Sequence, residues 1–207
     1  MKAIVFDVDN TLIDWKDEYI FALKNVLKEM NLNYSQELVE KIDNVIDDYE
    51  KENDILEKNV MLDYINSKCN LNLSLEFIDK LLVAQGECIY ENKVLVPLME
   101  YLSNKYDLFV ISNWYTKTQK IRLKKLGIAK YFKKIIGADI NHLKPDKRAF
   151  DIILNEYNAN DIISIGDSFE NDIELPASLG MKVLWKTAEK SDKYKTFEKI
   201  EELKDLL

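Results

Sequence analysis

Short apolar runs alternate with segments of helical periodicity through the second half of this chain. The apolar runs cover residues 108–111, 134–136, 162–165 and 181–185, and helical spacing of apolar residues covers 116–126, 146–157 and 171–179. Strands that are apolar throughout are buried on both faces, and when helices separate them they form a parallel sheet covered on both sides. The pattern predicts a doubly wound α/β core. A final helix is expected to hold Phe197, Ile200, Leu203 and Leu206.

The first half of the chain has a different composition. After a short apolar strand at residues 3–6, residues 15–94 repeat apolar side chains at helical spacing, with Gly86 as their single glycine and no proline. Helices are expected over 15–30 and through 38–49 and 56–65, and Ser74 is expected to cap a fourth helix. We therefore divide the chain into a core of residues 1–14 and 95–207 and an inserted α-helical cap of residues 15–94.

Two carboxylates follow the first strand, in the segment Asp7-Val8-Asp9. Alternation along a strand places residues i and i+2 on the same side. Two crowded acids make a poor core but a good cation site, and they provide one group to attack and one to move a proton. Plain turn chemistry is the competing interpretation, because Asp and Asn also favour turns.

Polar residues follow the other predicted strands as well. They are Ser112-Asn113, then Lys144-Pro145, then Gly166-Asp167 with Asn171-Asp172. Ligands of doubly wound sheets bind beyond the carboxyl ends of the strands, where these side chains are expected to converge.

Taken in order, these segments resemble the four motifs of the haloacid dehalogenase-like (HAD) superfamily. The segments are Asp7-Val8-Asp9-Asn10-Thr11-Leu12, Ser112-Asn113, Lys144-Pro145 and Gly166-Asp167-Ser168-Phe169-Glu170-Asn171-Asp172. The resemblance covers the whole chain and implies a Rossmann-like core with a helical cap inserted after the first motif. Asn10 stands where many members have glycine, and little effect is expected because Asn tolerates unusual backbone angles.

The resemblance also implies roles for these residues in phosphate-ester hydrolysis. Asp7 would be the nucleophile that forms an aspartyl-phosphate, and Asp9 the general acid and then the general base. Ser112, Asn113 and Lys144 would bind the phosphoryl group. Asp7, the backbone carbonyl of Asp9, and Asp167 would bind Mg²⁺, with Asp172 as a supporting acid. Mg²⁺ and Lys144 would reduce the repulsion between a carboxylate and a phosphate dianion.

Charge and hydropathy restrict the partners. The formal net charge is −8, and the chain has only two arginines and no basic tract, which argues against binding of a nucleic-acid polymer. A small phosphorylated metabolite is the expected partner. The N-terminus does not resemble a signal peptide and no apolar stretch reaches transmembrane length, so we expect a cytoplasmic protein that does not bind a membrane. A homodimer is possible.

Several activities remain open at this stage. The leading hypothesis is a Mg²⁺-dependent phosphatase acting on a sugar phosphate, phosphoglycolate or a nucleoside monophosphate. A haloacid dehalogenase needs neither a metal nor a leaving-group acid, so Asp9 and Asp167 would be unexplained. A phosphomutase differs only in the acceptor of the phosphoryl group. A non-catalytic binding protein on the same fold is expected to lack a catalytic carboxylate, and none is lost here.

Several residues outside the motifs also lead to expectations about their surroundings. Trp114 is expected to form part of the substrate wall or to pack in its loop, and Trp15 to act at a hinge or in cap packing. His142 is expected to be an exposed loop histidine. The acidic run over residues 47–52 is expected to be a solvated helix face.

Overall fold

Parallel strands form the centre of the molecule. The computed structural model describes residues 2–14, 18–88 and 92–207, and within them the sheet has six strands in the order β3-β2-β1-β4-β5-β6. The strands are β1 (Ala3–Phe6), β2 (Asp107–Ile111), β3 (Phe132–Ile136), β4 (Ile162–Gly166), β5 (Lys182–Lys186) and β6 (Lys195–Phe197). Every pair of neighbours is parallel. The predicted doubly wound α/β fold is confirmed.

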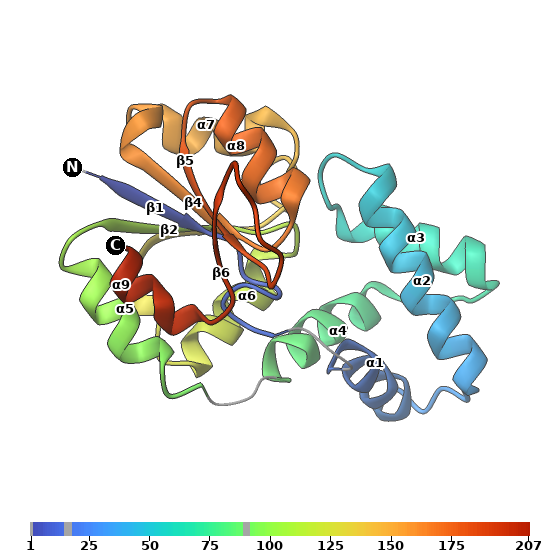
Figure 1. Cartoon of the computed structure of the whole chain (residues 1–207). Helices are drawn as coiled ribbons and strands as arrows, with labels where there is room; N and C mark the ends of the chain where they lie inside the picture. Colours follow the sequence, from blue (N-terminus) through green and yellow to red (C-terminus); the bar gives the residue numbers. More distant parts are fainter. Residues whose placement is uncertain (1, 15–17, 89–91) are drawn as a thin grey trace.

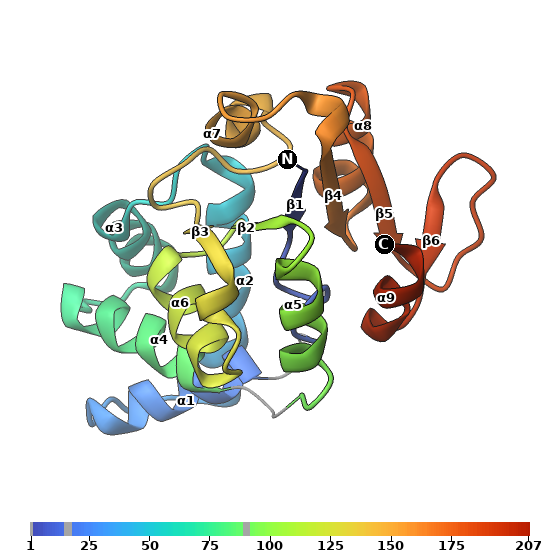
Figure 2. The ribbon, with the colours of Figure 1, turned by 90° about the vertical axis from the view of Figure 1, so that its left-hand side faces the viewer.

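Helices cover both faces of this sheet (Figures 1 and 2). They are α5 (Leu95–Ser103), α6 (Thr116–Lys125), α7 (Asp151–Leu154), α8 (Leu175–Ser178) and α9 (Leu203–Leu206). Ile4 and Phe6 of β1 share a buried cluster with α5 and α9, whereas Ala3 and Val5 share another with the segment around α7. The alternation of side chains along a buried strand therefore fills two cores at once.

The remaining helices lie to one side of the sheet, at the right of Figure 1. They are α1 (Glu18–Glu29), α2 (Gln36–Glu52), α3 (Lys58–Cys69) and α4 (Leu75–Glu87). Their apolar faces form a cluster of their own, which also takes in Trp114, Tyr115, Ala138 and Leu143 from the loops that follow β2 and β3. These helices are thus packed onto the carboxyl edge of the sheet. The division into a core and a cap at residues 14/15 and 94/95 stays a prediction.

Most predicted elements are present, with shifted ends. Ser74 occupies the N-cap position of α4 as expected, although its side chain makes no capping hydrogen bond. Gly127 and Gly180 follow α6 and α8 with φ of +73° and +89°, a backbone conformation that favours glycine. The third helix begins only at Lys58, and its expected apolar residue Val60 is 43% exposed, because Met61, Ile65 and Cys69 form the buried face.

Three helix predictions are wrong in type or extent. Phe197 lies in strand β6, because the edge of β5 offers it parallel backbone pairing. Residues 146–157 form a 3₁₀ turn over Lys147–Phe150 followed by the short α7. The helix predicted over residues 171–179 is a π-helical segment, Phe169–Glu174, that leads into α8.

In the part of the chain that the structure describes, no helix has both the length and the apolar character needed to span a membrane.

Candidate active site

The candidate nucleophile lies directly after β1, at the carboxyl edge of the sheet. The backbone N–H of Asp7 donates to the carbonyl of Ile165 at 2.9 Å, so the end of β4 fixes the position where the chain leaves β1. Asn10 adopts φ of +59°, a left-handed conformation, which agrees with the expectation that Asn replaces glycine here without difficulty. Asp7 and Asp9 both line one cavity beyond the strand ends.

Lys144 joins two of the candidate acids. Its Nζ lies 2.9 Å from the Asp7 carboxylate and 2.6 Å from that of Asp172; Lys144 and Asp172 are buried and Asp7 is mostly so. Asn113 holds the backbone of Lys144 on both sides, donating to its carbonyl at 2.7 Å and accepting from its N–H at 2.8 Å. Burial opposes the positive charge, but the two carboxylates outweigh it and raise the pKa of Lys144. The lysine therefore stays protonated.

The acids around this lysine are destabilised as anions. Burial raises the pKa of Asp7 to about 7 against the opposing charge of Lys144, and the charges of Asp172 and Asp9 add to the rise. Burial also raises the pKa of Asp167 and of Asp172. Gly166 allows this crowding, since a Cβ there would lie 2.2 Å from the Asp172 carboxyl group. An additional positive charge would relieve all three acids.

The geometry of these acids fits a hard cation. One carboxylate oxygen from each of Asp7, Asp167 and Asp172 lies within 4.8 Å of the other two. Thr11 donates to Asp167 at 3.2 Å and orients it. Mg²⁺ takes oxygen ligands, usually one or two carboxylates plus waters. The acids predicted from the sequence thus lie together, with Asp172 as close to the group as Asp167.

Asp9 points away from this group. Gln119 donates to one of its oxygens at 2.7 Å, and Arg122, which is 1% exposed, forms an ion pair with the other. Gln119 also donates to Ser112 Oγ at 2.8 Å, which links Asp9 to the residue after β2. Sequence reasoning missed Gln119 and Arg122. Their i, i+3 spacing on a predicted helix that starts just after Ser112 was the available signal.

We expect replacement of Arg122 by Met to lower the free energy of unfolding by about 2–4 kcal/mol, because it leaves the partly buried Asp9 carboxylate without its cation. Urea denaturation measures this change. Lys120→Met is the matched control, because Lys120 lies exposed on the same helix. Equal free energies of unfolding for the two variants would show that the ion pair with Asp9 does not stabilise the fold.

The cavity has a volume of about 240 Å³ and is lined by residues of α1, α2 and α4 in addition to the strand ends. Tyr19 of α1 and Gln85 of α4 line it together with Trp114, whose indole N–H donates to Gln85 at 3.1 Å. Trp114 is 4% exposed and its ring lies 5.5 Å from that of Tyr19, so it is a packing residue that also borders the cavity. Trp15 lies outside the described residues.

The acidic run of α2 is not wholly a solvated face, which corrects the expectation. Asp47 and Glu50 line the cavity together with Asp43, one helical turn earlier. Asp48, between them in sequence, is 60% exposed. The apolar spacing shows which side of α2 faces the core, but it does not show that the acids beside this face border a cavity.

Burial raises the pKa of Glu50 from 4.5 to about 8, with the charge of Asp9 as the next cause. The folded protein therefore binds a proton that the unfolded chain releases between these values. The contribution of Glu50 to stability is fully present below about pH 4.5 and is lost as the pH rises to about 8.

In metal-free protein at alkaline pH, Glu50→Gln is expected to raise the free energy of unfolding by about 2 kcal/mol. Urea denaturation at acid and alkaline pH measures this, with Asp48→Asn as control; an unchanged pH profile would contradict it.

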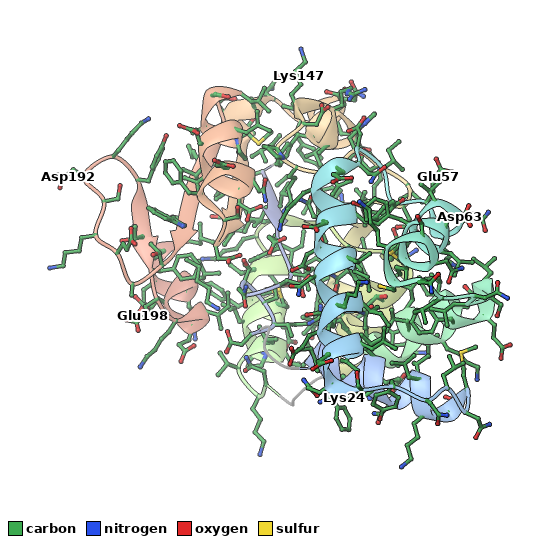
Figure 3. All side chains as sticks on the ribbon, turned by 90° about the vertical axis from the view of Figure 1, so that its right-hand side faces the viewer. Lys24, Glu57, Asp63, Lys147, Asp192 and Glu198 are labelled. Carbon is green, nitrogen blue, oxygen red and sulfur yellow. The ribbon has the colours of Figure 1, made fainter. Side chains whose placement is uncertain are left out.

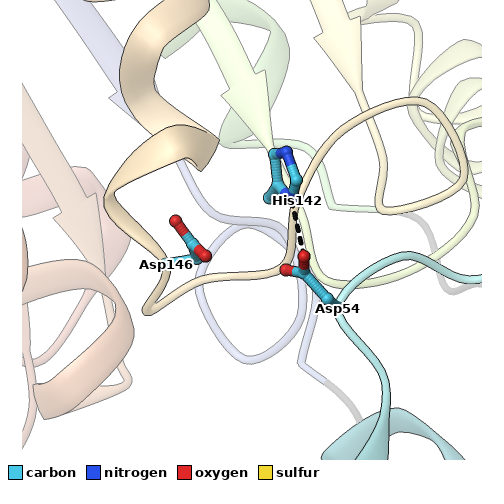
Figure 4. Close-up of side chains that lie close together, drawn as sticks. All are labelled: Asp54, His142 and Asp146. Atoms are coloured by element: carbon cyan, nitrogen blue, oxygen red, sulfur yellow. Dashed lines mark hydrogen bonds and ion pairs between the residues drawn. The ribbon is translucent and has the colours of Figure 1, made fainter.

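His142 is not simply an exposed loop residue. Its Nδ1 lies 2.9 Å from the carboxylate of Asp54, which follows α2, and Asp146 lies on the other side (Figure 4). Arg148 pairs with both acids, at 2.8 Å from Asp54 and 2.5 Å from Asp146. With Arg148 already between the two carboxylates, this cluster connects the α2–α3 loop to the loop after β3 and does not resemble a second metal site.

Comparison with known proteins agrees with this architecture. The family model described as haloacid dehalogenase-like hydrolase matches residues 4–186. The glyceraldehyde 3-phosphate phosphatase of Methanothermobacter thermautotrophicus is 28% identical over 205 residues, with 89% of this chain and 84% of that protein covered. The pyrimidine 5'-nucleotidase PynA of Streptococcus pneumoniae is 26% identical over 203 residues, with 89% and 83% covered.

A solved structure shows the same fold. The crystal structure of the HAD-hydrolase YfnB of Bacillus subtilis, bound to magnesium, superposes with a TM-score of 0.77. The two sequences are 20% identical, and the match covers 99% of this chain and 97% of that one.

Proposed function

This chain belongs to the haloacid dehalogenase-like hydrolase family, and we propose that it is a Mg²⁺-dependent phosphatase of small phosphomonoesters. The observation that carries the proposal is the buried contact of Lys144 with Asp7 and Asp172, beside Asp167 and apart from Asp9. This arrangement would supply a nucleophile, a fixed cation and a separate acid. The phosphatase and the nucleotidase among its relatives support the choice of substrate class.

Asp7 is proposed as the nucleophile. Its carboxylate oxygen would form a bond to phosphorus while the bond from phosphorus to the ester oxygen breaks, which leaves an aspartyl-phosphate and an alcohol. Lys144 would hold the phosphoryl oxygens from a fixed position, so that it needs no rearrangement as the charge shifts. Ser112 and Asn113 line the cavity beside it and are proposed as further phosphoryl ligands.

Asp9 is proposed as the general acid and base. It would give its proton to the departing alcohol oxygen and then take one from the water that attacks the aspartyl-phosphate, which releases phosphate and restores Asp7. Gln119 and Arg122 hold its carboxylate from α6, away from the acids around Lys144. The separation keeps the two carboxylates available for different steps.

Asp7, Asp167 and Asp172 are proposed to hold Mg²⁺, with the backbone carbonyl of Asp9 as a further ligand. When bound, the ion would neutralise charge on the phosphoryl oxygens and on the crowded acids. Residues 15–94 are proposed to act as a cap that closes the cavity and excludes water.

Two related activities use parts of the same site. A dehalogenase would leave the partly buried Asp167 and the Asp9–Arg122 pair without a function, whereas a phosphomutase would use every group. The distinction lies in the acceptor, because a phosphomutase transfers the phosphoryl group to a second hydroxyl and releases no free phosphate.

The test is phosphate release from a panel of small phosphomonoesters with Mg²⁺ and with EDTA. We expect release that EDTA abolishes and added Mg²⁺ restores. A folded, Mg²⁺-loaded protein that releases phosphate from no ester, p-nitrophenyl phosphate included, would overturn the proposal. Assays for chloride release from 2-chloropropionate and for phosphoryl exchange between hydroxyls would then identify the two alternatives.

A further inference from the structure

We propose that this site, if it has the proposed phosphatase function, selects phosphomonoesters whose alcohol carries a protonated amine and no second anionic group. The inference comes from the cap side of the cavity, where acids from one helix face the phosphoryl-binding residues. It goes beyond the phosphatase proposal because it concerns the part of the substrate that leaves.

The acids that face the leaving group come from one side of α2. Asp43, Asp47 and Glu50 are spaced by four and three residues, a spacing that puts them on one helical face. All three line the cavity whose opposite wall holds Asp7 and Lys144. Figure 3 shows α2 in front of the core strands. A phosphoryl group bound at Lys144 would therefore direct its alcohol toward these carboxylates.

No cation of the described residues neutralises these acids directly. Their carboxylates form no ion pair or hydrogen bond within residues 2–14, 18–88 and 92–207, and Lys144 is the only Lys or Arg of those ranges that lines the cavity. Lys144 already contacts Asp7 and Asp172. Lys51 lowers the pKa of Asp47 only in part. At a pH above the pKa of Glu50, this side of the cavity thus has negative charge without an internal counterion among the described residues.

Burial raises the pKa of Asp43, of Asp47 and of Glu50, the last to about 8. A group whose anion is destabilised in this way gains from a cation brought by a ligand. A second carboxylate or phosphate on the substrate would instead add to the repulsion, because it would bring another negative charge next to these acids.

The adjoining cavity is also lined by more acids than cations. It has a volume of about 580 Å³ and shares Glu50, Asn113, Lys144 and Asn171 with the first cavity. Glu52 and Glu170 line it together with Lys51, and of its other acids Asp54 and Asp146 are already paired with Arg148. A ligand that approaches the site from this side therefore passes more carboxylates than cations, which disfavours polyanions.

Pairs of esters that differ in one charged group test the proposal. O-phosphoethanolamine and 2-phosphoglycolate carry an amine or a carboxylate on the same two-carbon frame, and 3-aminopropyl phosphate and 3-phosphonooxypropionate differ similarly on a three-carbon frame. We expect kcat/KM to favour the amine in each pair by roughly tenfold or more at a pH just above the pKa of Glu50. The double variant Asp47→Asn/Glu50→Gln should lower this ratio several-fold, whereas Asp48→Asn, which does not line the cavity, should leave it unchanged.

The outcomes separate the two proposals. Turnover of p-nitrophenyl phosphate with equal or higher kcat/KM for the carboxylate esters would overturn the inference and leave the phosphatase function standing. A ratio that the double variant does not change would also overturn it, because the acids of α2 would then not set the preference. Single variants at Asp47 and Glu50 provide the same test should the double variant not fold. No turnover of any ester would overturn the phosphatase function itself.

Discussion

Asp7→Asn is expected to lower phosphate release by a factor of about a thousand or more, because an amide oxygen is a poor nucleophile toward phosphorus. The decrease should appear in kcat. Single-turnover kinetics with a radiolabelled phosphomonoester measures it directly, since the wild type should form an acid-stable phosphoenzyme and the variant should form none. Release that survives in Asp7→Asn would show that another residue is the nucleophile.

The stability of Asp7→Asn separates catalysis from folding. Burial raises the pKa of Asp7 to about 7, so its anion is destabilised in the folded protein. Above that pH the neutral amide removes this cost, and the free energy of unfolding of the metal-free variant should be no lower than that of the wild type. Asp14→Asn is the control for a lost surface charge, because Asp14 is 79% exposed. Its activity should equal that of the wild type.

Lys144→Met is the second substitution with a large expected effect. Its side chain is 3% exposed and contacts Asp7 and Asp172, whose side chains are 11% and 4% exposed. Removing one partner of a buried ion pair typically costs about 3–5 kcal/mol, because the other charge stays buried without compensation. We expect a loss of this size in the free energy of unfolding, together with at least a hundredfold lower kcat/KM from the lost phosphoryl ligand. Urea denaturation and phosphate-release assays measure the two effects.

Two further variants test the cause of that loss. Lys147→Met is the matched control, because Lys147 projects from the surface (Figure 3) and should cost less than about 0.5 kcal/mol. Asp172→Asn combined with Lys144→Met removes one of the uncompensated charges and should recover part of the stability but not the activity. If the double variant is no more stable than Lys144→Met, the charge of Asp172 is not what the lysine compensates.

The sequence predicted the strands and helices whose apolar residues follow a regular pattern. The continuous apolar runs that became β1, β2 and β4 can be buried only in a sheet covered on both faces, which dictated the parallel core. It failed at residues 195–197, where the periodicity matched a helix and the free edge of β5 instead offered backbone pairing. Such an edge exists only after the rest of the sheet has formed, so no local pattern predicts it.

For the candidate site, the sequence determined which acids and which lysine meet, because each follows a strand and parallel strands end at one edge. Only the tertiary structure decided how they pair. It placed Lys144 between Asp7 and Asp172, and it brought Arg122 and Gln119 of α6 to Asp9. It also turned the acidic face of α2 into the cavity. These contacts join residues far apart in the chain, and they depend on how helices dock on the sheet, which side-chain spacing along a single helix does not encode.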